Sequence, residues 1–237
     1  VRLDDSQILS LTDELRKRLQ TLEQVTTDGK FHPLASPLID SATQGMRLKT
    51  LDAWDKQREI LKQANELEPQ LPSTLQAELR DYQLDGFNWA SRLAFWGGGA
   101  CLADDMGLGK TLQALAVILS HAEQGPSLVL APTSVCFNWR QEALRFSPTL
   151  KVKMFGEISD IDKRQELLDG VEAFDLVICS YGILQREGER LAKVKWQSII
   201  ADEAQALKNP LAKRTQAALG LSAHFKMITT GTPIENN

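Results

Sequence analysis

The fold is decided by the stretch Asp104-Asp105-Met106-Gly107-Leu108-Gly109-Lys110-Thr111. It follows a short apolar run, Ala100 to Ala103, that is typical of a strand, and it opens a helical stretch, Thr111 to His121. A strand, a glycine-rich loop and a helix in this order provide the context that a phosphate-binding loop needs. The sequence therefore predicts that residues 104 to 111 hold the phosphates of a nucleotide such as ATP.

Three kinds of residue in this loop suit that chemistry. Glycines let backbone N–H groups turn inward around phosphate oxygens, Lys110 supplies a positive charge for the β and γ phosphates, and the Thr111 hydroxyl is a ligand for Mg²⁺. The general pattern has its first glycine where this chain has Asp104. A plain glycine-rich loop therefore stays open as an alternative for this stretch taken alone.

A second acidic element complements the loop. The apolar run Ser198 to Ala201 ends in Asp202-Glu203, which places two carboxylates at the carboxyl end of a strand, where open α/β sheets bind ligands. Asp202 is expected to hold Mg²⁺, directly or through water, and Glu203 to orient and deprotonate the attacking water. The alternative is a solvated turn.

The region after Pro72 alternates short apolar runs with helical stretches. Because the runs are continuous rather than alternating, we expect strands that are covered on both faces. They are residues 100–103, 127–131, 152–155, 175–180, 198–201 and 225–229, and the helical stretches between them are residues 111–121, 135–146, 161–168, 182–185 and 211–219. This pattern predicts an α/β fold with a mainly parallel sheet flanked by helices.

The N-terminal part has a different pattern. Apolar residues recur every three or four positions from Ser6 to Leu22, which predicts a helix capped by Asp5 or Ser6. Asp28 to Pro37 is expected to be a loop, and Leu48 to Leu67 a second helix that ends before Pro69. We therefore expect a helical extension over residues 1–70 and an α/β domain over residues 71–237.

The composition excludes several classes of protein. The chain has 237 residues, 43% of them hydrophobic and 24% charged, and a net charge of −4, which argues against binding to nucleic acid or membranes through bulk positive charge. No apolar run approaches the roughly 20 residues of a membrane span, so no membrane partner is expected. The three cysteines are widely spaced, which suggests neither a disulfide framework nor a structural metal. The chain reads as soluble and intracellular, and its first residue, Val1, suggests an excised fragment.

Five sequence blocks occur in the order found in Swi/Snf-type ATPases, which are helicase-like motors of superfamily two. They are residues 79–83 (LRDYQ), 104–111 (DDMGLGKT), 130–134 (LAPTS) leading to 138–142 (NWRQE), 202–205 (DEAQ) with 208–210 (KNP), and 230–236 (TGTPIEN). The chain resembles this family from Leu79 to Asn236. The resemblance implies a RecA-like lobe that binds ATP with Mg²⁺, and the family tolerates a residue other than glycine at position 104.

The resemblance also implies roles for residues outside the phosphate loop. Gln83 looks like the reader of adenine, because a carboxamide complements adenine N6 and N7; an ordinary surface glutamine is the alternative. Pro132, Thr133 and Ser134 are expected to meet the sugar-phosphate backbone of DNA, and helix capping is an equally good explanation of the two hydroxyls.

Further residues are expected to couple nucleotide state to motion between lobes. These are Thr230, Gly231 and Thr232, although a tight turn explains the glycine as simply, and Gln205, which stands where many relatives carry His. Trp139 and Trp196 are expected to be packing residues rather than platforms for bases.

The function that follows is the first lobe of a motor that couples ATP hydrolysis to translocation on double-stranded DNA or to remodelling of protein–DNA complexes. In this superfamily a second RecA-like lobe supplies an arginine finger, and no such motif follows Asn236, so we expect the lobe alone to be weakly active or inactive. The alternatives are a strand-separating helicase or restriction-complex motor, and an ATP-dependent binding module or switch. The expected location is cytoplasmic, with the nucleoid in a bacterium or the nucleus in a eukaryote.

Overall fold

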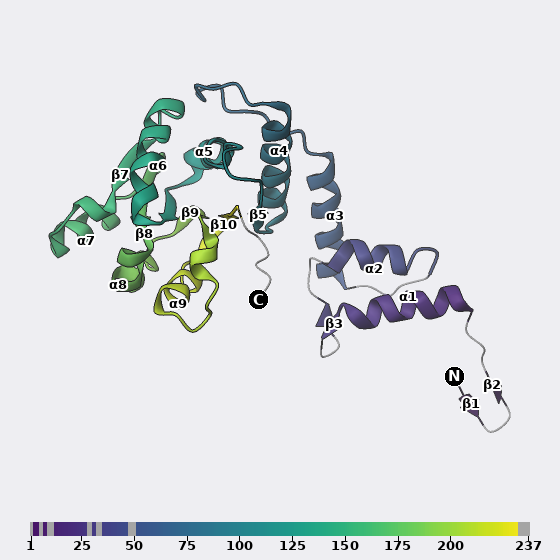
Figure 1. Ribbon diagram of the computed structural model, residues 1–237. Helices are drawn as coiled ribbons and strands as arrows, with labels where there is room; N and C mark the ends of the chain where they lie inside the picture. The colour runs from purple at the N-terminus through teal and green to yellow at the C-terminus, as the bar shows by residue number, and fades with distance from the viewer. Residues whose placement is uncertain are drawn as a thin grey trace. The chain divides into compact units, whose positions relative to one another are not determined.

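The computed structural model describes residues 2–4, 7–8, 12–27, 30–31, 35–46 and 51–231. The chain forms two compact units, Val1–Glu66 and Leu67–Asn237 (Figure 1). In the described part of the chain, no helix is both long and apolar enough to cross a membrane.

The first unit contains three helices and two small antiparallel strand pairs among its described residues. The helices are α1 (Asp13–Gln24), α2 (Ser36–Ala42) and α3 (Asp52–Glu66), and the pairs are β1 (Arg2–Asp4) with β2 (Gln7–Ile8) and β3 (Thr26–Thr27) with β4 (Lys30–Phe31).

Two predicted boundaries in this unit are wrong. The first helix begins at Asp13 rather than near Ser6, because the Thr12 hydroxyl caps it by accepting a hydrogen bond from the Leu15 N–H at 3.2 Å. The segment expected to be a loop, Asp28 to Pro37, contains β4 and the start of α2. The proposed caps Asp5 and Ser6 lie outside the described residues.

The second unit is built on a six-stranded sheet in the order β5-β10-β9-β6-β8-β7, in which every pairing is parallel. All six predicted strands are present, as β5 (Ala100–Leu102), β6 (Ser127–Ala131), β7 (Lys151–Met154), β8 (Asp175–Ser180), β9 (Trp196–Ala201) and β10 (Ala223–Thr229). The predicted α/β fold with a mainly parallel sheet is confirmed.

Helices cover both faces of this sheet, as the arrangement in Figure 1 shows. One core cluster joins the sheet to α4 (Asp81–Trp96), α5 (Lys110–His121) and α6 (Thr133–Phe146), and the other joins it to α7 (Ile161–Asp169), α8 (Tyr181–Leu191) and α9 (Lys213–Leu219). Strand β6 explains the division: Val129 and Ala131 belong to the first cluster, Leu128 and Leu130 to the second. Short 3₁₀ turns occur at Ala122–Gln124, Phe155–Glu157 and Ala204–Leu207.

Strand β10 departs from the expectation that every strand is covered on both faces. Phe225, Met227 and Thr229 are buried, whereas His224, Lys226 and Ile228 are exposed. Because successive side chains of a strand point to opposite faces, β10 packs on the core with one face only. The strand therefore combines a buried face with an open one.

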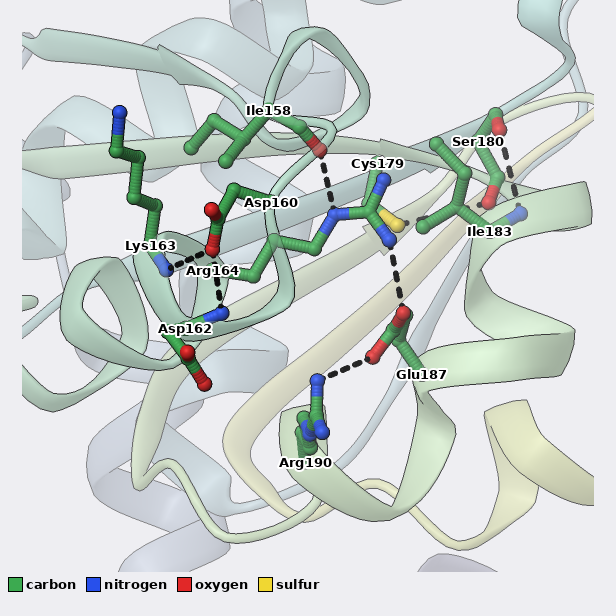
Figure 2. Close-up of polar contacts among 10 residues, drawn as sticks. All are labelled: Ile158, Asp160, Asp162, Lys163, Arg164, Cys179, Ser180, Ile183, Glu187 and Arg190. Carbon is green, nitrogen blue, oxygen red and sulfur yellow. Dashed lines mark hydrogen bonds and ion pairs between the residues drawn. The ribbon is translucent and has the colours of Figure 1, made fainter.

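A partly buried ion pair joins α7 to α8 (Figure 2). Arg164 and Glu187, each only 12% exposed, are joined at 2.8 Å, and Arg190 donates to the second Glu187 oxygen at 3.2 Å. The Arg164 Nε–H also donates to the Ile158 carbonyl at 2.7 Å, and its guanidinium lies 5.5 Å from the centre of the Phe155 ring. The two charges are paired and hydrogen-bonded, and the contact adds a polar link between α7 and α8 to the apolar packing of α8 on the sheet.

At the other end of the sheet, His121 should make the stability of the second unit depend on pH. It lines a pocket of about 410 Å³ with His224 and Phe225, and its Nδ1 lies 3.0 Å from the Val117 carbonyl oxygen. Burial lowers the pKa of His121 from 6.5, and the nearby His224 acts in the same direction, although the hydrogen bond to Val117 opposes them.

Burial makes protonation of His121 less favourable in the folded state than in the unfolded state. His121 therefore leaves the free energy of unfolding unchanged at pH values above its own pKa in the unfolded chain. As the pH falls through and below that pKa, it lowers the free energy of unfolding. We expect the urea midpoint to fall between pH 7.5 and pH 5.5, and to fall less in His121→Gln. An equal fall in both proteins, measured by urea unfolding at each pH, would exclude this role for His121.

Candidate functional site

The phosphate loop connects β5 to α5 at the carboxyl edge of the sheet. Gly107 and Gly109 have φ values of 85° and 76°, in the left-handed region that favours glycine. A Cβ atom at Gly109 would also lie 2.5 Å from Gln83 Nε2. A side chain at position 109 would therefore be both strained and obstructed.

The side chain of Lys110 folds back onto the backbone of the phosphate loop. Lys110 Nζ donates to the carbonyl oxygens of Asp104 and Asp105 at 2.7 and 2.9 Å. Lys110 is also the first residue of α5, whose N-cap is Gly109 and whose first turn has no side-chain cap. The first N–H groups of a helix lack partners within the helix, so the loop and this turn present donors suited to an anion.

Asp104, where the general pattern has glycine, is tied to α5. Its Oδ2 accepts a hydrogen bond from Gln113 Nε2 at 3.2 Å. Gln113 is buried and lies so close to Gly86 of α4 that a Cβ there would be 2.0 Å from Gln113 Oε1. Sequence reasoning missed both Gln113 and Gly86, because no local pattern distinguishes them.

Gln83 is not the ordinary surface residue that was considered as an alternative. It is 6% exposed on α4; its Oε1 accepts from the Arg80 N–H and its Nε2 donates to the Leu108 carbonyl, both at 3.0 Å. The Tyr82 hydroxyl donates to the same carbonyl at 3.2 Å. A carboxamide has two donors and two lone pairs, so one of each remains for a ligand.

The Asp202 carboxylate is held from several directions. Its Oδ2 accepts from Trp139 Nε1 at 2.8 Å, and its Oδ1 accepts from the Thr229 hydroxyl and from the Glu203 N–H at 3.0 Å. The Tyr181 hydroxyl, at the start of α8, donates to the Asp202 carbonyl at 2.7 Å. As expected, Trp139 is buried and is no platform for bases, but its contact with Asp202 was not foreseen.

Glu203 adopts an unusual backbone conformation. Its φ is 51°, which few residues other than glycine adopt, and such strain is concentrated at functional sites. Its Oε2 accepts a hydrogen bond from Gln205 Nε2, and Gln205 Oε1 accepts one from the Thr230 hydroxyl at 2.9 Å. A chain of hydrogen bonds therefore joins Glu203 to the end of β10.

The end of β10 lies between the acidic residues and the phosphate loop. The Thr230 N–H donates to the Leu102 carbonyl of β5 at 3.1 Å, and a Cβ at Gly231 would lie 2.9 Å from Met106 Cγ. Strand order gives the reason, because β10 pairs with β5 on one side and β9 on the other. Thr232, also expected to couple nucleotide state to motion, lies outside the described residues.

Burial and the negative charge of the site together raise the pKa values of neighbouring acidic groups. Burial raises the pKa of Glu142, and the charge of Asp202 raises it further. Burial also raises the pKa of Tyr181 well above its usual range, with added contributions from Asp202 and Glu203. Such a field favours a cation near the two acids. No cluster of three His, Cys, Asp or Glu suited to a metal ion occurs among the described residues.

The segment Pro132 to Ser134 begins helix α6. Pro132 occupies the N-cap position, and no side chain caps the helix, so the alternative that Thr133 or Ser134 acts as the cap is wrong. Both residues lie exposed in the first turn. Their hydroxyls are therefore accessible to a partner beside the free N–H groups of that turn.

Among known protein families, the SNF2-related domain matches this chain over residues 82–237. The chromatin-remodeling ATPase INO80 of Aspergillus oryzae is 38% identical over 184 residues, which cover 73% of this chain and 13% of that protein. INO80 of Sclerotinia sclerotiorum is 39% identical over 178 residues, which cover 70% of this chain and 10% of that protein. The chain thus spans a small part of these relatives.

A solved structure of the Sulfolobus solfataricus SWI2/SNF2 ATPase core in complex with dsDNA is similar in fold, with a TM-score of 0.64 and 40% sequence identity over 72% of this chain and 36% of that one. The same core domain without DNA matches with a TM-score of 0.59. The resemblance to Swi/Snf-type ATPases and the RecA-like fold are confirmed, and the chain belongs to the SNF2-related domain family.

Proposed function

We propose that this chain contains the first, ATP-binding lobe of a Swi/Snf-like motor. Residues 71–237 form the lobe, and a mainly helical extension of residues 1–70 precedes it in the sequence. The whole motor couples hydrolysis of Mg-ATP to translocation on double-stranded DNA or to remodelling of protein–DNA complexes. One observation supports the proposal most: two adjacent threonines connect the acidic pair with the phosphate loop. The Thr229 hydroxyl donates to Asp202, and the Thr230 N–H donates to the Leu102 carbonyl of β5, the strand that leads into the loop.

The residues present fit a magnesium triphosphate. Lys110, the loop glycines and the first turn of α5 offer donors to phosphate oxygens. Mg²⁺ prefers oxygen ligands and is held by few carboxylates together with substrate phosphates, which suits the Thr111 hydroxyl and Asp202. Three donors already use the Asp202 carboxylate, so about one of its four lone-pair sites stays available to the ion or its water. Bound there, Mg²⁺ would neutralise charge on the phosphates.

Glu203 is the group that we assign to the water. Its carboxylate would accept a proton from the water that attacks the γ-phosphate, while Gln205 donates to Oε2 and so orients the side chain. Because Gln205 also accepts a hydrogen bond from the Thr230 hydroxyl, its side chain connects the end of β10 with the proposed base, Glu203. We assign the coupling of nucleotide state to motion to Gln205, Thr230, Gly231 and Thr232.

The remaining assignments follow the family. Gln83 would read adenine with its spare donor and lone pair, and Pro132, Thr133 and Ser134 would meet the DNA backbone at the start of α6. The names of the relatives place those proteins at chromatin and give no support to a cytoplasmic location. Under this proposal the protein works where the DNA is, which is the nucleus if the organism is a eukaryote.

Lys110→Ala should lower the affinity for Mg-ATP by about 10- to 100-fold, because a hydrogen bond to a charged group contributes roughly 1.5–3 kcal/mol. Isothermal titration calorimetry on the 237-residue chain measures this effect. Lys226→Ala is the matched control, since Lys226 Nζ also donates to a backbone carbonyl, that of Leu221, but lies outside the loop. If the wild-type chain gives no heat with Mg-ATP, or if both variants bind as it does, the assignment is wrong.

A further inference from the structure

One hydrogen bond to the proposed magnesium ligand, Asp202, comes from helix α6. Trp139 Nε1 donates to Asp202 Oδ2 at 2.8 Å, a length typical of a charge-assisted bond. Trp139 is 1% exposed and Asp202 8% exposed, so water competes little with this contact. The bond connects α6 with the end of β9.

The two oxygens of the carboxylate have separate partners. Oδ1 accepts from the Glu203 N–H and the Thr229 hydroxyl, whereas Trp139 is the donor to Oδ2 recorded in the described part of the chain. Three donors therefore define the plane of the carboxylate: one from α6, one from β10 and one from the backbone of the next residue. Without the indole N–H, Oδ2 would be a buried acceptor with one fewer partner, and the carboxylate would be held through Oδ1 alone.

The chemistry of the donor matters as much as its position. An indole N–H has no net charge, so it orients the carboxylate while leaving its negative charge available to a cation. An arginine or lysine in the same place would compete with a cation for that charge. Groups that orient a metal-binding side chain in this way tune the affinity for the metal.

We propose that Trp139 is a positioning residue for the magnesium–nucleotide site: its indole N–H holds Asp202 in the orientation that supports Mg²⁺. This inference rests on the proposed function, because it takes Asp202 as the magnesium ligand. It assigns a second role to α6, since the same helix begins at the segment that we expect to contact DNA.

Trp139→Phe tests the proposal, because it removes the N–H and keeps an aromatic ring. The measurement is binding of a fluorescent ATP analogue to the 237-residue chain over a series of Mg²⁺ concentrations, with EDTA as the metal-free point. We expect the Mg²⁺ concentration needed for half-maximal enhancement of binding to rise about tenfold or more, as is typical for loss of a group that orients a metal ligand. Binding in EDTA should stay within about twofold.

Trp196→Phe is the matched control. Trp196 is 3% exposed, and its Nε1 donates to the Leu191 carbonyl at 2.8 Å, so the change removes an equally buried bond of the same length away from Asp202. Its Mg²⁺ requirement should equal that of the wild-type chain. A shift of the same size in both variants would mean that loosened packing causes the effect, and would overturn the proposal.

The other outcomes separate the two levels of the argument. If nucleotide binding to the wild-type chain does not depend on Mg²⁺, the proposed function fails. If it does, and Trp139→Phe has the wild-type requirement, only the role of Trp139 fails. Should Trp139→Phe not fold, benzothienylalanine at position 139 replaces the N–H by sulfur with nearly the same shape; a wild-type Mg²⁺ requirement in that protein would equally overturn the proposal.

Discussion

The whole motor of the proposed function, here called the full-length product, should hydrolyse ATP at least about 10³-fold faster than this chain alone when double-stranded DNA is present, because an arginine finger contributes about 10³–10⁵ to the rate. In the proposed site, this chain supplies phosphate donors, oxygen ligands for Mg²⁺ and a base. We expect the arginine to come from a second RecA-like lobe. The chain alone should therefore bind Mg-ATP far better than it hydrolyses it.

Steady-state phosphate release by the two proteins, at saturating Mg-ATP and with and without duplex DNA, measures this difference. A calorimetric titration run in parallel shows that both proteins bind the nucleotide. Equal and vigorous activity of the chain and the full-length product would show that no second lobe is needed. The appearance of separated strands in a gel assay would instead favour a strand-separating helicase.

Glu203→Gln in the full-length product should lower the rate of hydrolysis by about 10²–10⁴-fold, the range typical of a general base. Glutamine has nearly the same shape as glutamate but cannot accept the proton of the attacking water. Affinity for Mg-ATP should change little, since the phosphate donors and Asp202 are intact. Single-turnover hydrolysis and nucleotide binding, measured on the same protein, separate the two effects.

The control for this substitution is Glu142→Gln. The pKa of Glu142 is raised by burial and by the charge of Asp202, so this acid lies within the field of the site, on α6. We expect its rate to stay within a few-fold of the wild-type rate. A large loss in Glu142→Gln with a normal rate in Glu203→Gln would move the role of base to α6. An ATP-dependent switch would keep its cellular activity in Glu203→Gln, whereas a motor would bind ATP and stop.

The strands were predictable because most of them are continuous apolar runs. The bounds of β6 and β8 agree with the sequence prediction to the residue, since Ser127–Ala131 and Asp175–Ser180 are buried throughout. Strand β10 carried a different signal, because His224 and Lys226 alternate with Phe225 and Met227. That alternation indicates one open face, and the expectation of two covered faces overlooked it.

The contacts of the site were less accessible than the motifs. The sequence blocks identify Lys110 and Asp202, but the hydrogen bond from Trp139 joins residues 63 positions apart, and only tertiary structure brings them together. The burial of Gln83 likewise depends on α4 (Asp81–Trp96), a helix that the sequence analysis did not delimit. Local patterns indicate which residues carry chemistry, whereas the partners that orient them follow from packing.

The order of the strands also has a consequence for biosynthesis. β5 is the first strand of the sheet to be synthesised, yet its partner in the sheet is β10, the last, and Ala100 lies opposite Met227. During synthesis, more than half of the chain must therefore be added after β5 before this strand, which leads into the phosphate loop, can pair with β10. Such distant pairing is slow to form, so we expect nucleotide binding to be acquired as a final step of maturation, after the central strands have assembled.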